Sequence, residues 1–115
     1  MDANAVKQAV REGKSITGED LSGLDLAGFD LSNADLNKCN LRETNLNGAN
    51  LSNSKLINCD LRKANLKEAN LFRADLSGTR LRRANLTGSI RLECTINQSA
   101  LKGAIITGDT PYLED

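Results

Sequence analysis

The chain contains no histidine and no tryptophan, and its aromatic side chains are limited to two phenylalanines and one tyrosine. Without histidine, the Ser-His and Cys-His pairs that activate many enzymatic nucleophiles cannot form. So few aromatic side chains leave little with which to stack nucleic-acid bases. The three cysteines have a spacing that fits no zinc-binding pattern. We therefore expect a protein that is not an enzyme and that uses no cofactor or metal.

Long apolar runs are also missing, and 26% of the residues are charged, which excludes a transmembrane helix. The first residues, Met1 to Lys7, lack the basic start and apolar stretch of a signal peptide. These features predict a single domain that is cytoplasmic and does not bind membranes. The net charge is zero but unevenly spread: residues 1–37 carry seven acidic and three basic side chains, whereas 61–91 carry eight basic and two acidic ones.

What the chain does have is leucine or isoleucine at every fifth position from Ile16 to Ile106, with Arg91 as the exception. A five-residue step rotates about 140° on an α-helix and alternates faces on a strand. Neither element can therefore bury this series on one side, and the chain must turn once per repeat. The expected core positions are Leu21, Leu26, Leu31, Leu36, Leu41, Leu46, Leu51, Leu56, Leu61, Leu66, Leu71, Leu76, Leu81, Leu86, Ile96, Leu101 and Ile106.

The positions around each leucine follow the same period. Two residues before it, 15 consecutive repeats from Ala34 to Ala104 carry only Ala, Cys, Ser or Thr, which suits a narrow interior. One residue before it, 12 of 19 repeats carry Asp or Asn, whose side chains bond to nearby backbone amides. Two of the small residues, Cys39 and Cys59, lie 20 apart, and we interpret them as small buried thiols rather than a disulfide.

Segments such as Ala34-Asp35-Leu36, Ala49-Asn50-Leu51 and Ala84-Asn85-Leu86 resemble the A(D/N)LXX signature of the pentapeptide repeat family. The resemblance implies a right-handed, four-sided parallel β-helix with four repeats per coil, and bacterial origin. Nineteen repeats then give just under five coils of an all-β solenoid. Some family members imitate duplex DNA and protect DNA gyrase, but those are longer, acidic rods, and the basic middle of this chain disfavours that role.

The two ends predict caps. Residues 1–13 are expected to contain a helix over 3–12, with Asp2 as its N-cap and Gly13 at its end, above a β-helix over 14–108. Leu24 and Phe29 replace small residues in the first coil and should fill the lumen beneath this helix. Residues 109–115 form a C-terminal tail, and the apolar residues at this end are Ile105, Ile106, Pro111, Tyr112 and Leu113. We favour a capping tail on a monomer over an end-on dimer.

Arg91 interrupts the leucine series without adding residues. Because an unpaired charge in an apolar lumen is costly, we expect a distorted coil here. Either Ile90 or Leu92 would turn inward with a local bulge, or Arg91 would project from a small loop.

If residues 20 apart stack, one side of the solenoid carries a basic stripe. Its candidate interaction residues are Arg42, Arg62, Lys63, Arg80, Arg82, Arg83 and Lys102. The stripe could bind an acidic partner or a phosphate backbone, or it could be solvated surface partly neutralised by Asp60 and Glu43. A second candidate is the stacked pair Phe72 and Leu92, either a protein-contact patch or a cover over the corner at Arg91.

The pattern favours a rigid, non-catalytic module that binds a protein partner. Binding of acidic or phosphate surfaces, including nucleic acid, through the Arg42/Arg62/Arg82/Lys102 stripe is the alternative, and gyrase protection is the least supported.

Overall fold

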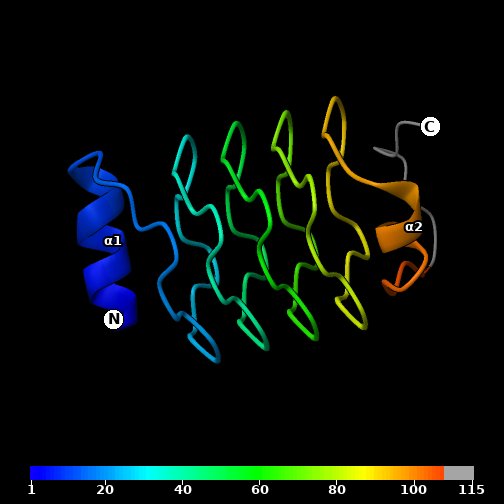
Figure 1. The fold of residues 1–115 in the computed structure, drawn as a ribbon, viewed down its shortest axis with the longest axis horizontal. Coiled ribbons are helices and arrows are strands. Elements are labelled where there is room, and N and C mark those ends of the chain that lie inside the picture. Colours follow the sequence, from blue (N-terminus) through cyan, green and yellow to red (C-terminus); the bar gives the residue numbers. More distant parts are fainter. Residues whose placement is uncertain (108–115) are drawn as a thin grey trace.

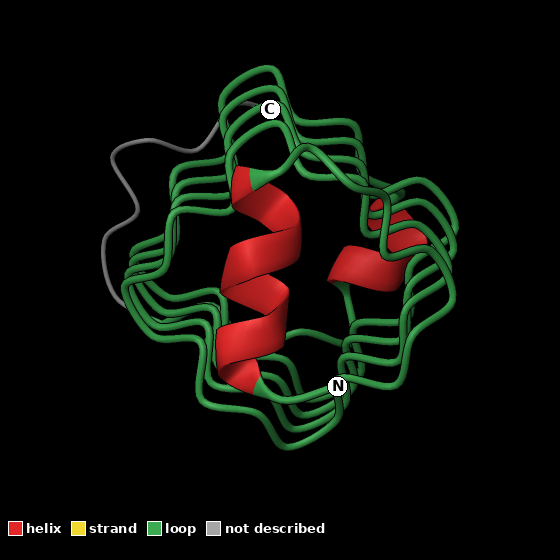
Figure 2. Cartoon of the chain, turned by 90° about the vertical axis from the view of Figure 1, so that its left-hand side faces the viewer, coloured by secondary structure: helices red, strands yellow, loops and turns green. Residues whose placement is uncertain are grey.

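The computed structural model describes residues 1–107 as an elongated solenoid with a helix at each end (Figure 1). Helix α1 spans Ala3–Arg11 and helix α2 spans Gln98–Leu101. Viewed along the solenoid, the coils superimpose in a four-sided outline, and α1 lies across the mouth (Figure 2). Neither helix among these residues has the length or apolar character that crossing a bilayer requires.

Successive coils pair through parallel bridges between residues 20 apart, from Asp20↔Asn40 to Asn85↔Ile105. This register means that four five-residue repeats complete one coil. In the described residues these contacts are isolated bridges and not extended strands. The reason is local, because four residues of each repeat form a turn and leave one residue to pair. The expected parallel β-helix is thus present in its coil register, and residues 1–107 pair through single bridges without continuous strands.

The polar residue before each leucine organises that turn. In each of the 12 repeats with Asp or Asn, the side-chain oxygen Oδ1 accepts from the backbone N–H two residues later, at 3.0–3.2 Å. A backbone bond then closes each turn, as from Leu24 N–H to Leu21 O at 3.3 Å. The predicted side-chain-to-amide bonding is confirmed, and it explains why the sequence repeats these two residue types.

In each repeat from Ile16 to Arg91, the second residue after the inward residue has a positive φ. Six of these 16 positions are glycine, and the other ten carry a side chain, including Glu43 and Lys63 at φ 58° and 62°. Positive φ at the third turn residue is the hallmark of a type II turn. A side chain there strains the backbone by about 1–2 kcal/mol. The regular hydrogen bonding between coils must offset this strain at every such repeat.

The leucines fill the lumen. All 14 from Leu21 to Leu86 are at most 1% exposed. The last three members of the series, Ile96, Leu101 and Ile106, are only partly buried because the solenoid ends there. The small residues two positions earlier are buried from Ala34 to Ser89, including Ala49, Ala69 and Ala84 at 0% exposure, whereas the last three of them are partly buried or exposed.

Helix α1 covers the N-terminal end of the lumen. Asp2 is its N-cap, with Oδ1 accepting from Ala5 N–H at 2.8 Å, and Gly13 follows its end with φ 69°. Val6, on the inner side of α1, is fully buried, and Phe29 packs against the core. The ammonium of Lys7 lies 5.8 Å from the centre of the Phe29 ring, a cation–π contact between helix and first coil.

At the other end, helix α2 replaces the turn of one repeat. The leucine spacing alone does not predict this helix. Asn97 is its N-cap, with Oδ1 accepting from Ser99 N–H at 2.8 Å. Of the apolar residues noted at this end, Ile105 is 43% exposed. Pro111, Tyr112 and Leu113 lie outside the described residues, as does the whole of the expected tail, residues 109–115.

The prediction of a distorted coil at Arg91 is wrong. Arg91 occupies the inward position of its repeat and is 3% exposed. Its neighbour Ile90 keeps the regular bridge to Asn70, and Leu71 N–H donates to Ile90 O at 2.8 Å. The following turn is also regular, with Glu93 at φ 54°. Preserving these backbone bonds outweighs the penalty of placing the guanidinium inside, so the side chain adapts and the coil does not.

Candidate docking face

One side of the solenoid carries what we call the basic face, the five residues Arg42, Arg62, Lys63, Arg82 and Arg83. Backbone bonds hold its coils in register: Glu43 N–H donates to Arg62 O at 3.0 Å and Lys63 N–H to Arg82 O at 3.0 Å. The arginines therefore lie one above another along the rod, as the 20-residue period predicts. Their side chains, rooted in turns, project from the wall into solvent.

An acidic residue neutralises the middle of this face. Asp60 accepts from Arg62 through both oxygens, with Nε to Oδ1 at 2.9 Å and Nη2 to Oδ2 at 2.6 Å. This two-point pairing lowers the pKa of the Asp60 carboxyl below its ordinary value. The expected neutralisation by Asp60 is thus present. Glu43 makes no ion pair within residues 1–107, so it does not neutralise Arg42 directly.

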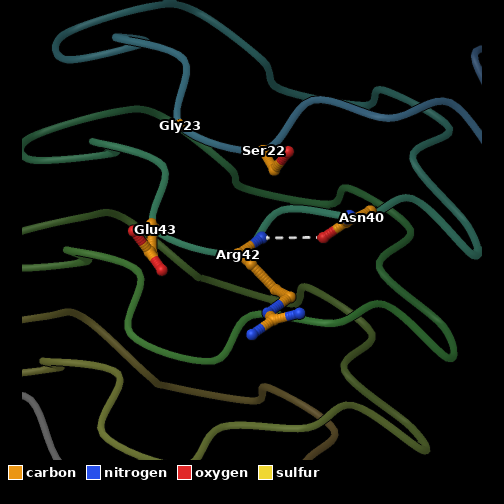
Figure 3. A pocket seen from close by; sticks show the side chains of 5 residues that line it. All are labelled: Ser22, Gly23, Asn40, Arg42 and Glu43. Carbon is orange, nitrogen blue, oxygen red and sulfur yellow. Dashed lines mark hydrogen bonds between the residues drawn. The ribbon is translucent and has the colours of Figure 1, made fainter.

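The other arginines of the basic face have no such carboxylate partner within residues 1–107. Within the described residues, no salt bridge involves Arg42, Arg82 or Arg83. The backbone N–H of Arg42 donates to Asn40 Oδ1 at 3.1 Å, while its side chain extends toward the next coil (Figure 3). Three uncompensated guanidinium groups and one lysine on adjacent coils give this face a positive potential.

The face is hollowed between its side chains. All five members of the basic face line one open depression. A second, adjoining depression brings Arg80 together with Arg62, Arg82 and Ser99 of α2. Lys102 is exposed just after α2, where the helix interrupts the stacking of turns. The structure therefore brings together the predicted stripe residues Arg42, Arg62, Lys63, Arg80, Arg82 and Arg83, and Lys102 lies at their border.

The repeat geometry and the comparison with known proteins agree. The family profile described as pentapeptide repeat region matches residues 29–106. The chain belongs to the pentapeptide repeat family. This pentapeptide repeat protein is similar to alr5209 of Nostoc PCC 7120, with 30% identity over 92% of this chain and 96% of that chain and a TM-score of 0.70. Its similarity to Rfr23 of Cyanothece 51142 reaches 35% identity over 84% of this chain and 62% of that chain, with a TM-score of 0.40.

A search of curated proteins gave no match to this pentapeptide repeat protein. The similarity to alr5209 therefore supports its fold.

The second candidate patch of this pentapeptide repeat protein is weaker than the sequence suggests. Phe72 is half-buried, and the guanidinium of Arg73 lies 5.0 Å from the centre of its ring. Arg73 also bonds to Glu93 at 3.4 Å, so this side chain partly covers the ring. Leu92 is 39% exposed. Because the coil at Arg91 is regular, the interpretation of Phe72 and Leu92 as a cover over a distorted corner is wrong.

The thiols are structural. Cys39 and Cys59 are free and buried, and their Sγ atoms lie 3.0 and 2.9 Å from the carbonyl oxygens of Ile16 and Leu36. Burial raises the pKa of both thiols, that of Cys59 to about 12. Burial also raises the pKa of Cys94 to about 12. Since the thiolate is the reactive form, these cysteines are poor nucleophiles.

Proposed function

We propose that this chain is a non-catalytic docking module that binds the acidic surface of another protein through its basic face. The observation that carries the proposal is the stacking of Arg42, Arg82 and Arg83 with Lys63 on one rigid wall, none of them in a salt bridge within residues 1–107. The coil register fixes the spacing of these side chains, so little backbone entropy is lost when a partner binds. We also infer a right-handed coil, a monomer, and a bacterial protein acting in the cytoplasm.

A protein partner suits this face better than nucleic acid. The basic face includes no aromatic side chain, so bases have nothing to stack on. Arginine forks instead match the planar carboxylates of Asp and Glu through paired hydrogen bonds. Asp60 already shows this geometry with Arg62 inside the face. A partner carboxylate can approach Arg42 or Arg82 in the same way.

A protein that imitates DNA to bind gyrase requires a negatively charged face, whereas the face described here is positively charged. It predicts that the purified protein inhibits supercoiling by gyrase. An absence of inhibition at micromolar concentrations is what the docking proposal expects.

The test uses two double variants with equal charge loss. Arg42→Ser/Arg82→Ser removes two unpaired guanidinium groups from the face, whereas Lys55→Ser/Lys67→Ser removes two exposed lysines from other sides. Binding of a fluorescein-labelled glutamate-rich peptide and of a DNA duplex is measured by anisotropy at low and high salt. We expect peptide binding that weakens with salt, and a loss of at least about tenfold only in the arginine double variant, since each charge contact contributes about 1 kcal/mol.

Two results would count against the proposal. Equal losses in the two double variants would show that binding follows net charge and not the basic face. Tighter binding of the duplex than of the peptide, abolished by the arginine substitutions, would assign the face to nucleic acid.

A further inference from the structure

The depression beside α2, which we call the α2 depression, collects positive charge without an acidic residue. It has a volume of about 500 Å³, and its lining includes Arg62, Arg80 and Arg82 but no Asp or Glu. Arg62 is paired with Asp60, whereas Arg80 and Arg82 are in no salt bridge within residues 1–107. Two positive charges at this place are therefore uncompensated by the described part of the chain.

A backbone donor at the same place is also unpaired. One coil earlier, Asp60 Oδ1 accepts from Arg62 N–H at 3.2 Å. Arg80 bridges to Asp60 and occupies the same position of its own repeat, but a guanidinium has no acceptor to offer. Arg82 N–H consequently donates to no acceptor within residues 1–107. The turn lacks the oxygen that its regular counterparts supply from their own Asp or Asn.

Helix α2 leaves a second backbone donor free. In the regular coils, a leucine donates its N–H to the carbonyl oxygen 19 residues later. For Leu81 this would be the carbonyl of Ala100, but that carbonyl accepts from Gly103 N–H at 3.2 Å beside α2. Leu81 N–H therefore has no acceptor in the described chain either, and both Leu81 and Arg82 line the α2 depression. Successive free backbone N–H groups in a turn are suited to binding an anion.

We propose that the α2 depression binds the phosphate group of a phosphorylated residue on the partner that docks on the basic face. The inference rests on the proposed docking function and names what that partner carries. A phosphate monoester has about −1.5 to −2 charges and three strong acceptor oxygens. Its charge balances the two uncompensated guanidinium groups, and its oxygens can accept from both of them and from Arg82 N–H. One oxygen then takes the place that Asp60 Oδ1 holds one coil earlier.

Other anions match these donors less well. A carboxylate carries one charge and two oxygens, so it leaves one guanidinium uncompensated when it reaches the depression. Each phosphodiester of a nucleic acid likewise carries a single charge. Clusters of arginine are the usual means by which proteins recognise phosphorylated residues. The donor set therefore favours a phosphate monoester on a protein segment.

The first measurement tests the site without a partner. Backbone amide signals of the full chain are followed by NMR while inorganic phosphate replaces chloride at constant ionic strength. Arg80→Asn removes the guanidinium and supplies the missing acceptor, and it should fold because Asn40 already accepts from Arg42 N–H in the same column. Arg80→Gln removes the same charge without the short side chain that closes the turn. The amide signal of Arg82 should shift with phosphate in the native protein, shift less in Arg80→Gln, and stay unchanged in Arg80→Asn.

The second measurement tests the source of the phosphate group. Three fluorescein-labelled peptides share one glutamate-rich sequence and carry Ser, Glu or phosphoserine at the central position, and anisotropy gives the Kd of each. The phosphoserine peptide should bind the native protein at least about tenfold more tightly than the Glu peptide. Arg80→Asn should abolish this preference. The matched control Arg42→Ser, which alters the basic face outside the α2 depression, should weaken all three peptides and keep the preference.

The outcomes separate the site from the docking function. An Arg82 amide that does not respond to phosphate, or that responds equally in Arg80→Asn, would overturn the site. Equal Kd values for the phosphoserine and Glu peptides would overturn the assignment to a phosphorylated partner. If no peptide binds while the Arg82 amide still shifts, the docking function fails and the phosphorylated partner with it, and the depression is a site for free phosphate.

Discussion

Leu61→Ala tests the central physical argument, that the five-residue period exists to fill the lumen. Leu61 is fully buried in the middle of the rod, between Leu41 and Leu81 in the adjacent coils. The substitution removes apolar carbon from the interior without touching the backbone or the surface. The matched control is Leu101→Ala at the end of the solenoid, where the same side chain is only partly buried.

The expected loss has two contributions. Shortening leucine to alanine removes about 2.4 kcal/mol of transfer free energy at about 0.8 kcal/mol per carbon. A cavity then remains because the wall cannot collapse: Leu41 N–H to Asp60 O and Leu61 N–H to Arg80 O, both 2.8 Å, hold the coils at a fixed register. The cavity raises the expected loss to about 4 kcal/mol, in the upper part of the range for buried leucines. Leu101→Ala should cost about 1–2 kcal/mol because water already reaches the side chain.

The free energy of unfolding is measured by urea denaturation followed by far-UV circular dichroism, with the m-value as a check on two-state behaviour. A loss of about 2.4 kcal/mol or less for Leu61→Ala would refute the argument that a rigid coil keeps the cavity open, because transfer alone accounts for that amount. So would an equal loss for Leu101→Ala, since position along the rod would then not matter.

Three further predictions address the turns, the thiols and the surface. Gly28→Ala should cost about 1 kcal/mol through backbone strain alone, because φ is 71° and an added Cβ meets no atom within 4 Å; a neutral result in urea denaturation would contradict the strain argument. Cys59→Ala should flatten the alkaline loss of stability: the folded-state pKa is raised from 9.0 to about 12, so the thiol's contribution is complete below pH 9 and disappears as the pH rises toward 12. Equal slopes for native protein and variant over that window would exclude this contribution. Asp60→Asn keeps the Oδ1 acceptor for Arg62 N–H but removes the ion pair, so salt-dependent retention on heparin should increase, and unchanged retention would argue against the basic face as a binding surface.

The sequence predicts much of the fold because each repeat position has one physical role. Leucine spacing identifies the lumen, Asp and Asn identify the turn bonds, and Asp2 with Gly13 marks the limits of α1. The prediction fails at Arg91, because a bulge that exposed the charge would break backbone hydrogen bonds between the coils, such as Leu71 N–H to Ile90 O. The unbroken spacing from Leu86 to Ile96 was the signal for a regular coil.

The site is less predictable than the fold for a related reason. The 20-residue register places the arginines on one wall, but it does not reveal which of them are paired. Asp60 lies two residues before Arg62, a spacing that brings both onto the same turn, and only side-chain geometry shows the bidentate bond. Similarly, Asn97 as an N-cap before Gln98 was the available signal for α2.

Because four repeats make one coil, the number of residues between two positions determines whether they lie on the same side of the solenoid. Inserting 20 residues in the middle of the rod adds one coil and leaves each side of the solenoid continuous. Inserting five residues between Leu46 and Leu51 instead advances everything downstream by one side, which moves Arg62 and Arg82 a quarter turn away from Arg42 while every leucine stays inside. A lineage of such proteins can therefore split or assemble a charged wall by gaining or losing a single repeat, without altering one residue of its interior.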